Sequence, residues 1–223
     1  MKKWSADNPK ARLMGRKRAA IVGAARESFL QSGYSDASMD GIADAAGVSV
    51  KTIYGHFKDK KELFSAVMQA ACLAEGAPEG PQDEASISAR FPWFIDATQH
   101  GLVEAGEEYL RHLLSQQQLA LYRVVTRDAD RFPELGMQYQ KDVVAGRTEI
   151  LVKYLGRTAR TNKWMLTNAQ RAGVVYEALL RADLFEAVLH GIRFPEARVI
   201  RKHARSAAIV MWRLMEAGIL GAD

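Results

Sequence analysis

Apolar residues recur at helical spacing along nearly the whole chain, and no segment alternates apolar and polar residues as a half-buried strand would. Proline and glycine divide this pattern into pieces of helix length, with Pro92, Pro133 and Pro195 at helix starts and Gly191 just past a helix end. The sequence therefore predicts an all-α protein. Its helices are expected near residues 16–32, 38–47, 49–57, 59–75, 91–113, 115–130, 134–158, 168–190 and 195–218.

Capping residues mark the first four helices. Gly33 is placed to stop the first helix in the left-handed conformation. Ser38 and Ser49 can cap the second and third helices, since a serine hydroxyl accepts a hydrogen bond from an N–H of the first turn. Residues 59–62 have the spacing of a capping box at the start of the fourth helix. The second helix is expected to bury Met39, Ile42, Ala45 and Ala46.

The two short helices over residues 38–57 have the proportions of a helix-turn-helix. On a helical wheel, the second of them has an apolar side that can anchor it: Val50, Ile53, Tyr54 and Phe57. The opposite side is polar, carries hydrogen-bond donors and contains no acid: Lys51, Thr52, Gly55 and His56. Tyr54 lies at the edge of the apolar side, so its ring can pack while its hydroxyl reaches a phosphate. Such a surface can contact the phosphates and base edges of DNA.

The positive charge of the chain is unevenly distributed. Residues 1–61 contain twelve Lys and Arg against six Asp and Glu, a net charge of +6, whereas the remaining residues carry −1. This asymmetry is typical of a chain in which one module meets a polyanion. Charge alone leaves an incidentally basic surface as the alternative.

Other classes of protein find little support. The single cysteine, Cys72, excludes an intrachain disulfide and a cysteine-clustered metal site. The histidines of the C-terminal part show no metal-ligand spacing, so no metal and no cofactor are expected. No nucleophile elbow, phosphate loop or dinucleotide fingerprint is found, which counts against an enzyme. No secretory signal or membrane-spanning apolar stretch is found, so we expect a cytoplasmic protein without membrane association.

Three stretches of the N-terminal region form a recognisable pattern. They are Ala-Ala-x-x-x-Phe at residues 24–29, Gly33-Tyr34, and Ile-Ala-Asp-Ala-Ala-Gly-Val-Ser at residues 42–49. A fourth and more specific stretch is the run Thr-Ile-Tyr-Gly-His-Phe-Lys-Asp-Lys-Lys-Glu-Leu at residues 52–63. Through these motifs, residues 16–66 resemble the DNA-binding domain of the TetR-type (tetracycline-repressor) family of bacterial regulators. The last run matches that family's T-[LIV]-Y-x-[HY]-F-x-[SND]-K-x-x-L pattern at every specified position.

The resemblance implies a role for each matching residue. Thr52, Tyr54 and Lys60 are expected to bind phosphates, Lys60 with the help of the helix dipole. Lys51 and His56, together with Gly55, occupy the variable, base-facing positions, although a small residue is commoner at the position of Lys51. The predicted DNA-binding residues are Ser38, Ser49, Lys51, Thr52, Tyr54, Gly55, His56 and Lys60. Residues 16–18 could form a basic arm on the DNA backbone or remain unengaged.

A cluster of helix-breaking residues at 76–84 indicates a domain boundary. We expect an N-terminal arm and helix-turn-helix domain over residues 1–62, and a helical ligand-binding and dimerisation domain over 63–223, with a connecting helix at about 60–75. Residues 123–135 resemble a segment from one branch of TetR-type C-terminal domains. The resemblance implies a bundle that holds a small molecule and dimerises through its last two helices.

Two sets of residues are candidates for these C-terminal functions. A stripe of small and apolar residues on the last helix is predicted to form the dimer interface, or alternatively to pack inside its own subunit: Ala204, Ala207, Ala208, Met211 and Met215. Aromatic walls and polar anchors are proposed for a ligand pocket, although most of the aromatic residues are expected to be core: His100, Tyr122, Arg123, Trp164 and Tyr176.

Together these observations predict a homodimeric, sequence-specific DNA-binding transcriptional regulator. It is expected to bind a palindromic site in double-stranded operator DNA and to act as a repressor released by a small apolar or aromatic ligand. One alternative is an all-helical small-molecule-binding protein or enzyme whose basic N-terminus is incidental. Another is an architectural DNA-binding protein without a ligand.

Overall fold

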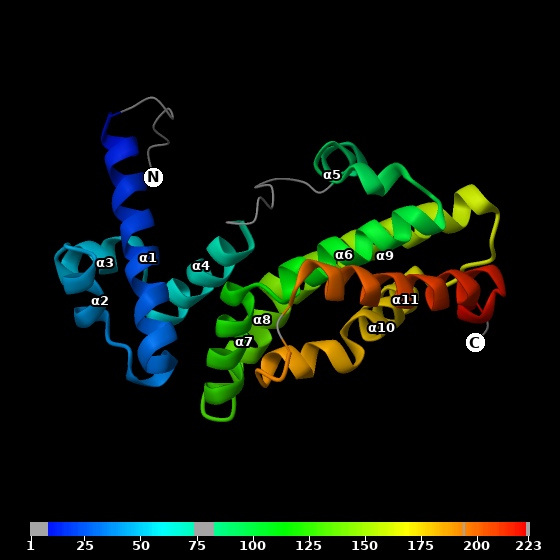
Figure 1. Ribbon diagram of the computed structural model, residues 1–223. Coiled ribbons are helices and arrows are strands. Elements are labelled where there is room, and N and C mark those ends of the chain that lie inside the picture. Colours follow the sequence, from blue (N-terminus) through cyan, green and yellow to red (C-terminus); the bar gives the residue numbers. More distant parts are fainter. Residues whose placement is uncertain (1–8, 74–82, 194, 222–223) are drawn as a thin grey trace. The chain divides into compact units, whose positions relative to one another are not determined.

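The computed structural model describes residues 9–73, 83–193 and 195–221, and within these ranges every regular element is a helix (Figure 1). The predicted all-α fold is therefore confirmed. The α-helices are α1 (Pro9–Asp36), α2 (Met39–Ala45), α3 (Val50–His56), α4 (Lys60–Leu73), α5 (Glu84–Arg90), α6 (Gln99–Leu113), α7 (Gln116–Asp128), α8 (Pro133–Tyr139), α9 (Ala145–Asn162), α10 (Ala169–Leu189) and α11 (Ala197–Glu216). Two 3₁₀-helices, η1 (Pro92–Ile95) and η3 (Ile219–Gly221), and a π-helix, η2 (Gln140–Val144), complete the described elements.

The chain divides into two compact units. Unit 1 comprises Met1–Ala77 and Ala120–Val143, and unit 2 comprises Pro78–Leu119 and Val144–Asp223. The division differs from the predicted boundary between residues 62 and 63, because most of α7, all of α8 and most of η2 belong to the same unit as the helix-turn-helix. Sequence pattern alone does not reveal this grouping, since it depends on contacts between residues far apart in the chain.

Helix α1 is longer than predicted. It begins at Pro9 rather than at residue 16, so the first described residues are helical and not an extended arm. The helix is broken at Gly33, where φ is 84° and ψ is 175°. The positive φ confirms the reason for glycine at this position, but the extended ψ differs from the expected left-handed helical turn. Ile21, Ala25 and Phe29 on one face of α1 are buried.

The predicted caps of α2, α3 and α4 are present. Ser38 Oγ accepts a hydrogen bond from the backbone N–H of Gly41 at 3.0 Å, and Asp59 Oδ1 accepts one from Glu62 at 2.8 Å. Met39 and Ile42 of α2 are buried as predicted. The prediction for Ala45 and Ala46 was wrong, because Ala45 is exposed and Ala46 half-buried. Ala43 takes the inward position instead, since it follows Met39 by four residues.

Residues 128–142 are tied to the DNA-binding helices within unit 1. The backbone N–H of Tyr34 donates to Asp128 Oδ2 at 2.7 Å, and Arg131 donates to Ser35 Oγ at 2.9 Å. The Ser65 hydroxyl on α4 donates to Asp142 Oδ2 at 2.9 Å. An aromatic cluster fills the space between these ties: Phe29, Tyr34, Phe64 and Phe132. Unit 1 is thus a helix-turn-helix stabilised by a later part of the chain.

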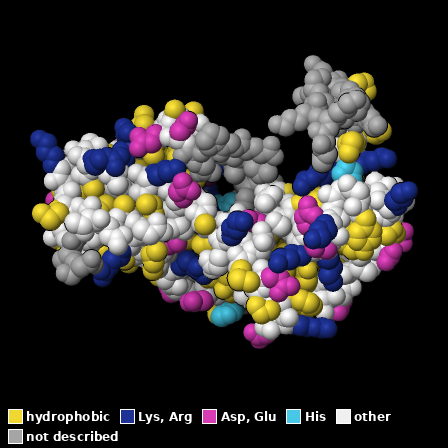
Figure 2. All heavy atoms as spheres, turned by 180° about the vertical axis from the view of Figure 1, so that it is seen from behind, with side chains coloured by type: hydrophobic (Ala, Val, Ile, Leu, Met, Phe, Trp, Pro, Cys, Tyr) yellow, Lys and Arg dark blue, Asp and Glu magenta, His cyan; other side chains and the backbone are white. Residues whose placement is uncertain are grey.

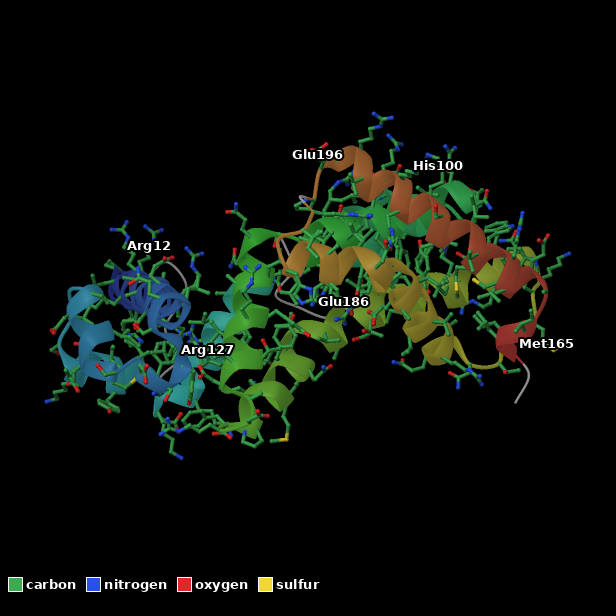
Figure 3. All side chains as sticks on the ribbon, turned by 60° about the horizontal axis from the view of Figure 1, so that its bottom comes forward. Arg12, His100, Arg127, Met165, Glu186 and Glu196 are labelled. Carbon is green, nitrogen blue, oxygen red and sulfur yellow. The ribbon has the colours of Figure 1, made fainter. Side chains whose placement is uncertain are left out.

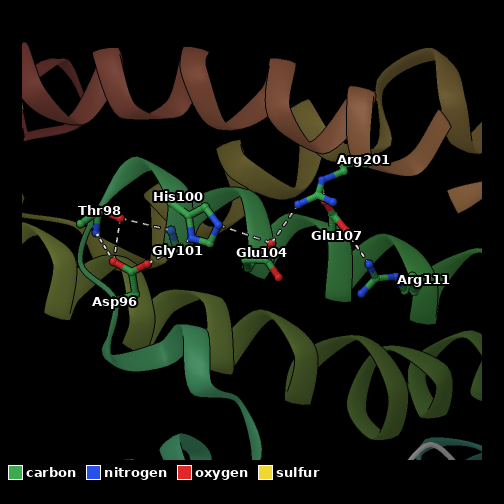
Figure 4. A network of polar contacts seen from close by, with 8 residues as sticks. All are labelled: Asp96, Thr98, His100, Gly101, Glu104, Glu107, Arg111 and Arg201. Carbon is green, nitrogen blue, oxygen red and sulfur yellow. Dashed lines mark hydrogen bonds and ion pairs between the residues drawn. The ribbon is translucent and has the colours of Figure 1, made fainter. Parts of the chain in front are cut away.

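Unit 2 is a helical bundle in which α6 packs along α11 and α9 packs along α10, which in turn contacts α11 (Figure 1). Two buried tyrosine hydroxyls fix the packing: Tyr154 donates to the Asp96 carbonyl at 2.8 Å and Tyr176 to the Leu102 carbonyl at 2.6 Å. Buried Glu107 on α6 forms ion pairs with Arg111 and, at 3.0 Å, with Arg201 of α11 (Figure 4). The bundle is therefore held by polar bonds as well as by apolar packing.

Several C-terminal helices are divided where the sequence predicts one. The segment 91–113 separates into η1 and α6, and the segment 134–158 is interrupted by the π-helix η2. Helix α10 has a non-helical residue at Ala182, and α5 was not predicted. Pro92 and Pro133 start their elements as expected, and Gly191 has a φ of 74° after α10. Residues 74–82, which hold most of the predicted boundary cluster, lie outside the described residues.

Candidate nucleic-acid interface

Helix α3 is anchored to unit 1 by its apolar side and capped at its start. Ile53 and Phe57 are buried. Ser49 Oγ accepts the backbone N–H of Thr52 at 3.2 Å and lies 2.9 Å from the Thr52 hydroxyl. Because the cap and the two buried side chains fix both ends of this seven-residue helix, its other side has a defined direction.

The outward side of α3 consists of the residues predicted to meet DNA. Lys51 and Gly55 are exposed, and a Cβ built on Gly55 meets no atom within 4 Å. Tyr54 was expected to pack its ring against the core, but its side chain is 53% exposed. The side chain of Tyr54 therefore belongs to the outward surface of α3. This arrangement gives α3 a small basic and aromatic face with room for close approach.

The imidazole of His56 on α3 is affected by the positive charges of a basic part of α1. Burial lowers the pKa of the His56 imidazole below its ordinary value, and the positive charges of Arg18 and Lys17 lower it further. The guanidinium of Arg18 lies 4.9 Å from the ring centroid of Phe57, next in sequence to His56. Arg18 precedes buried Ile21 by three residues, so the helical spacing of α1 already placed it on the side of α3.

Lys60 occupies a position that differs from the predicted phosphate site. Its ammonium donates to three backbone carbonyls at the end of α1, those of Tyr34 at 2.8 Å, Ser35 at 3.1 Å and Ala37 at 2.9 Å. It also lies 4.7 Å from the centroid of the Tyr34 ring. A lysine ammonium has three donors, and all three point into the protein. We therefore revise the role of Lys60 from a phosphate ligand to a cap of the last turn of α1.

The candidate ligand residues are not gathered in one place within either unit. Tyr122 and Arg123 belong to unit 1, and the Tyr122 ring packs edge-on against Tyr139 with centroids 6.0 Å apart. His100, Trp164 and Tyr176 belong to unit 2. Tyr176 is fully buried, and Trp164 stacks edge-on with Trp212 at 4.6 Å.

His100 lies on the surface of α6 (Figures 3 and 4). Its imidazole is 3.3 Å from Asp96 and 3.8 Å from Glu104. The exposed imidazole thus contacts two half-buried carboxylates of its own surface, which does not support its predicted role as a ligand anchor.

The stripe predicted for the dimer interface is packed inside its own subunit. All five of its residues are buried in the single chain: Ala204, Ala207, Ala208, Met211 and Met215. The prediction is corrected, because α11 directs this face toward α6 and α10, where small side chains permit close packing. Exposed apolar residues of the same helices, Val174 on α10 and Val210 on α11, lie on the other faces. On the surface drawn in Figure 2, apolar side chains are exposed at several separate places.

Within the described ranges, no three His, Cys, Asp or Glu side chains are grouped so that they could hold a metal ion. Among the same residues, no helix combines the length and hydropathy needed to cross a membrane.

A short helix-turn-helix followed by a larger helical bundle, with a basic outward face on its second helix, defines a DNA-binding transcriptional regulator. Family comparison agrees. Residues 21–67 match the family described as "Bacterial regulatory proteins, tetR family", and residues 100–214 match "AefR-like transcriptional repressor, C-terminal domain". The chain belongs to the TetR family of bacterial regulators.

Individual relatives show how far the similarity extends. The transcriptional repressor BepR of Brucella suis is 24% identical over 192 residues, which cover 79% of this chain and 87% of BepR. The transcriptional activator FasR of Mycolicibacterium smegmatis is 49% identical over 53 residues, and the match spans only 24% of each chain. The solved structure of the flavonoid-responsive regulator FrrA superposes with a TM-score of 0.72 at 24% identity, covering 89% of this chain and 96% of FrrA. The last similarity concerns the fold alone.

Proposed function

We propose that this regulator binds a palindromic operator as a homodimer, with α3 of each subunit in the major groove of one half-site. The observation that carries the proposal is the outward face of α3, on which Lys51, Tyr54 and Gly55 are exposed while Ile53 and Phe57 hold the helix in place. Thr52 and Tyr54 contact phosphates, whereas Lys51 and His56 read base edges.

Gly55 and the two cap serines complete this interface. The open space at Gly55 lets the DNA backbone or a base approach α3 closely. Ser38 and Ser49 act by fixing the starts of α2 and α3. The lowered pKa of His56 favours a neutral imidazole, which offers one donor and one acceptor to a base edge.

The proposed sense of regulation is repression. Its support is the match of residues 100–214 to a repressor C-terminal domain and the similarity to BepR over most of the chain. The similarity to the activator FasR is confined to 53 residues and so bears on DNA binding more than on the sense of regulation.

Release from DNA by a small aromatic or apolar ligand bound in unit 2 is part of the proposal. FrrA, which shares the fold, is described as flavonoid-responsive. As the polar group that orients such a ligand we propose the pair between α9 and α10 in which the Thr148 hydroxyl donates to Glu177 at 2.7 Å. Burial raises the pKa of that Glu177 carboxyl.

For dimerisation, we assign the outward faces of α10 and α11, which carry the exposed side chains Val174 and Val210. This assignment replaces the buried stripe of α11 and keeps the last two helices as the dimerisation elements.

The test is fluorescence anisotropy of labelled duplexes, comparing DNA from upstream of the gene with a random sequence of the same length. Wild type should bind the upstream DNA at least about a thousandfold more tightly. Thr52→Ala should weaken binding to both duplexes, whereas His56→Ala should reduce the preference by about 1–3 kcal/mol. Equal affinity for both duplexes would support the architectural alternative, and failure to bind either would support a protein without a DNA function.

The ligand is tested with a panel of flavonoids added to the preformed complex. Compounds that raise the thermal midpoint of the protein should also lower its operator affinity. Stabilisation without any loss of operator affinity would remove the ligand-release part of the proposal.

A further inference from the structure

The first three turns of α1 extend beyond the packed part of unit 1. Every residue from Arg12 to Ala20 is exposed, and burial in α1 begins at Ile21. In Figure 1 these turns project past α2 and α3, and Figure 3 places Arg12 on this end of the helix. Packing against the core of unit 1 therefore does not explain why the chain carries this part of α1.

The composition of the projecting turns is strongly one-sided. Residues 12–20 contain four basic side chains and no acidic one, the basic residues being Arg12, Arg16, Lys17 and Arg18. Four positive charges within this short stretch of helix repel one another, which destabilises an isolated helix. Binding to a polyanion relieves this repulsion, because the phosphates neutralise the positive charges and counterions are released from the polyanion.

The projecting turns of α1 lead directly to the outward side of α3. Arg18 lies 4.9 Å from the ring centroid of Phe57, and the charges of Arg18 and Lys17 both act on the imidazole of His56. A duplex that contacts His56 therefore comes within reach of the side chains on the preceding turn of α1.

From this exposure, charge and continuity, we infer that residues 12–20 of α1 form a second DNA-contacting surface, which binds backbone phosphates beside the half-site read by α3. The inference rests on the proposed operator binding. The contact adds affinity without base preference, since arginine and lysine recognise phosphates in any sequence. It also makes operator binding more dependent on salt than α3 alone would.

The test variant is Arg16→Gln with Lys17→Gln, which removes two exposed charges and leaves Arg18 on Phe57. Glutamine maintains helix propensity, so the thermal midpoint should not change. The matched control is Arg160→Gln with Lys163→Gln, two exposed basic residues of unit 2 whose removal changes the net charge equally.

Operator affinity is measured by anisotropy between 50 and 300 mM salt. Each lost phosphate contact flattens the slope of log K against log salt by about 0.9, so a dimer lacking two contacts per subunit should lose about 3.6. At 0.1 M salt the affinity should fall about tenfold or more, for operator and random DNA alike, while the control keeps the wild-type slope.

Other outcomes separate the inference from the proposed function. If wild type shows no operator preference, the proposed function fails before the variant is considered. If wild type shows the preference and the test variant behaves as the control does, the inference about α1 is overturned and the proposed function stands. The exposed Leu13 and Met14 make a lipid surface the rival partner. Binding to phosphatidylglycerol vesicles that the test variant loses, with unchanged operator binding, would also overturn the inference.

Discussion

Substitution of Lys60 by methionine separates the two roles that sequence and structure give to this residue. Methionine retains an unbranched stem but removes the ammonium, which donates to the carbonyls of Tyr34, Ser35 and Ala37. If the ammonium caps α1, its loss leaves three carbonyls at the end of that helix without their donor. If it binds a phosphate, its loss affects only DNA binding.

The expected cost follows from the three hydrogen bonds. A hydrogen bond from a charged donor contributes about 1.5 kcal/mol at the lower end of its range, the appropriate choice for a half-buried lysine. Three such bonds give about 4.5 kcal/mol, from which about 2 kcal/mol is subtracted for the rotamer entropy of an ordered lysine. The net loss is about 2.5 kcal/mol, or about 5–10 °C in the thermal midpoint of a protein of this size.

Differential scanning calorimetry measures this shift, with Lys61→Met as control because Lys61 is exposed in the same helical turn. Lys60→Arg should lose part of the stability, since a planar guanidinium cannot direct three donors as an ammonium does. Well below the midpoint, operator binding by Lys60→Met should retain its salt slope. An unchanged midpoint combined with a flatter salt slope would refute the capping role and restore the phosphate assignment.

Three further outcomes are expected. Gly33→Ala should destabilise the protein by more than about 1 kcal/mol in thermal unfolding, because φ is 84° there, whereas Gly23→Ala, with open space around it in α1, should be neutral or stabilising. Burial lowers the pKa of His112 to about 4 from 6.5, so the unfolded chain binds the proton first, and up to about 3 kcal/mol of stability should be lost as the pH falls from 6.5 to 4. His112→Gln should remove that loss, and an equally steep acid profile in the variant would contradict the assignment. Val210→Glu should give folded monomers by analytical ultracentrifugation, and Ala208→Glu should unfold the subunit, since Val210 is exposed and Ala208 fully buried. A dimeric Val210→Glu would exclude this face as the interface.

Local signals in the sequence were sufficient for the helix-turn-helix. Ser38, Ser49 and Asp59 each cap the helix that they were predicted to start, because a cap depends on residues two or three positions away. The outward side of α3 was likewise predictable from the helical period, since Ile53 and Phe57 define its inner side. The exception, Tyr54, stood at the edge between the two sides, where periodicity does not decide burial.

Long-range contacts were not predictable in the same way. The role of Lys60 depends on carbonyls about 25 residues earlier in the chain, and no local sequence pattern predicts these contacts. The stripe at Ala204 and Ala208 has the same sequence pattern whether it faces its own subunit or a second copy. The apolar periodicity also does not predict the break at η2. A π-helix changes the helical register here, and residues 140–144 contain no proline or glycine that would mark the break.

The extent of unit 1 bears on how ligand binding could reach DNA. A tenfold change in operator affinity requires a coupling free energy of only about 1.4 kcal/mol. The bond from the Tyr34 N–H to Asp128 joins α1 to α7, and a hydrogen bond to a charged group contributes about that much or more. Helix α7 begins in unit 2 and ends in unit 1, so the bond to Asp128 lies at the unit 1 end of a helix that both units share. Because Lys60 caps the adjoining turn of α1 and Ser65 of α4 bonds to Asp142, both helices that frame the helix-turn-helix meet the same later segment of the chain. Under the proposed ligand response, the free energy of these hydrogen bonds is of the size that a tenfold coupling requires.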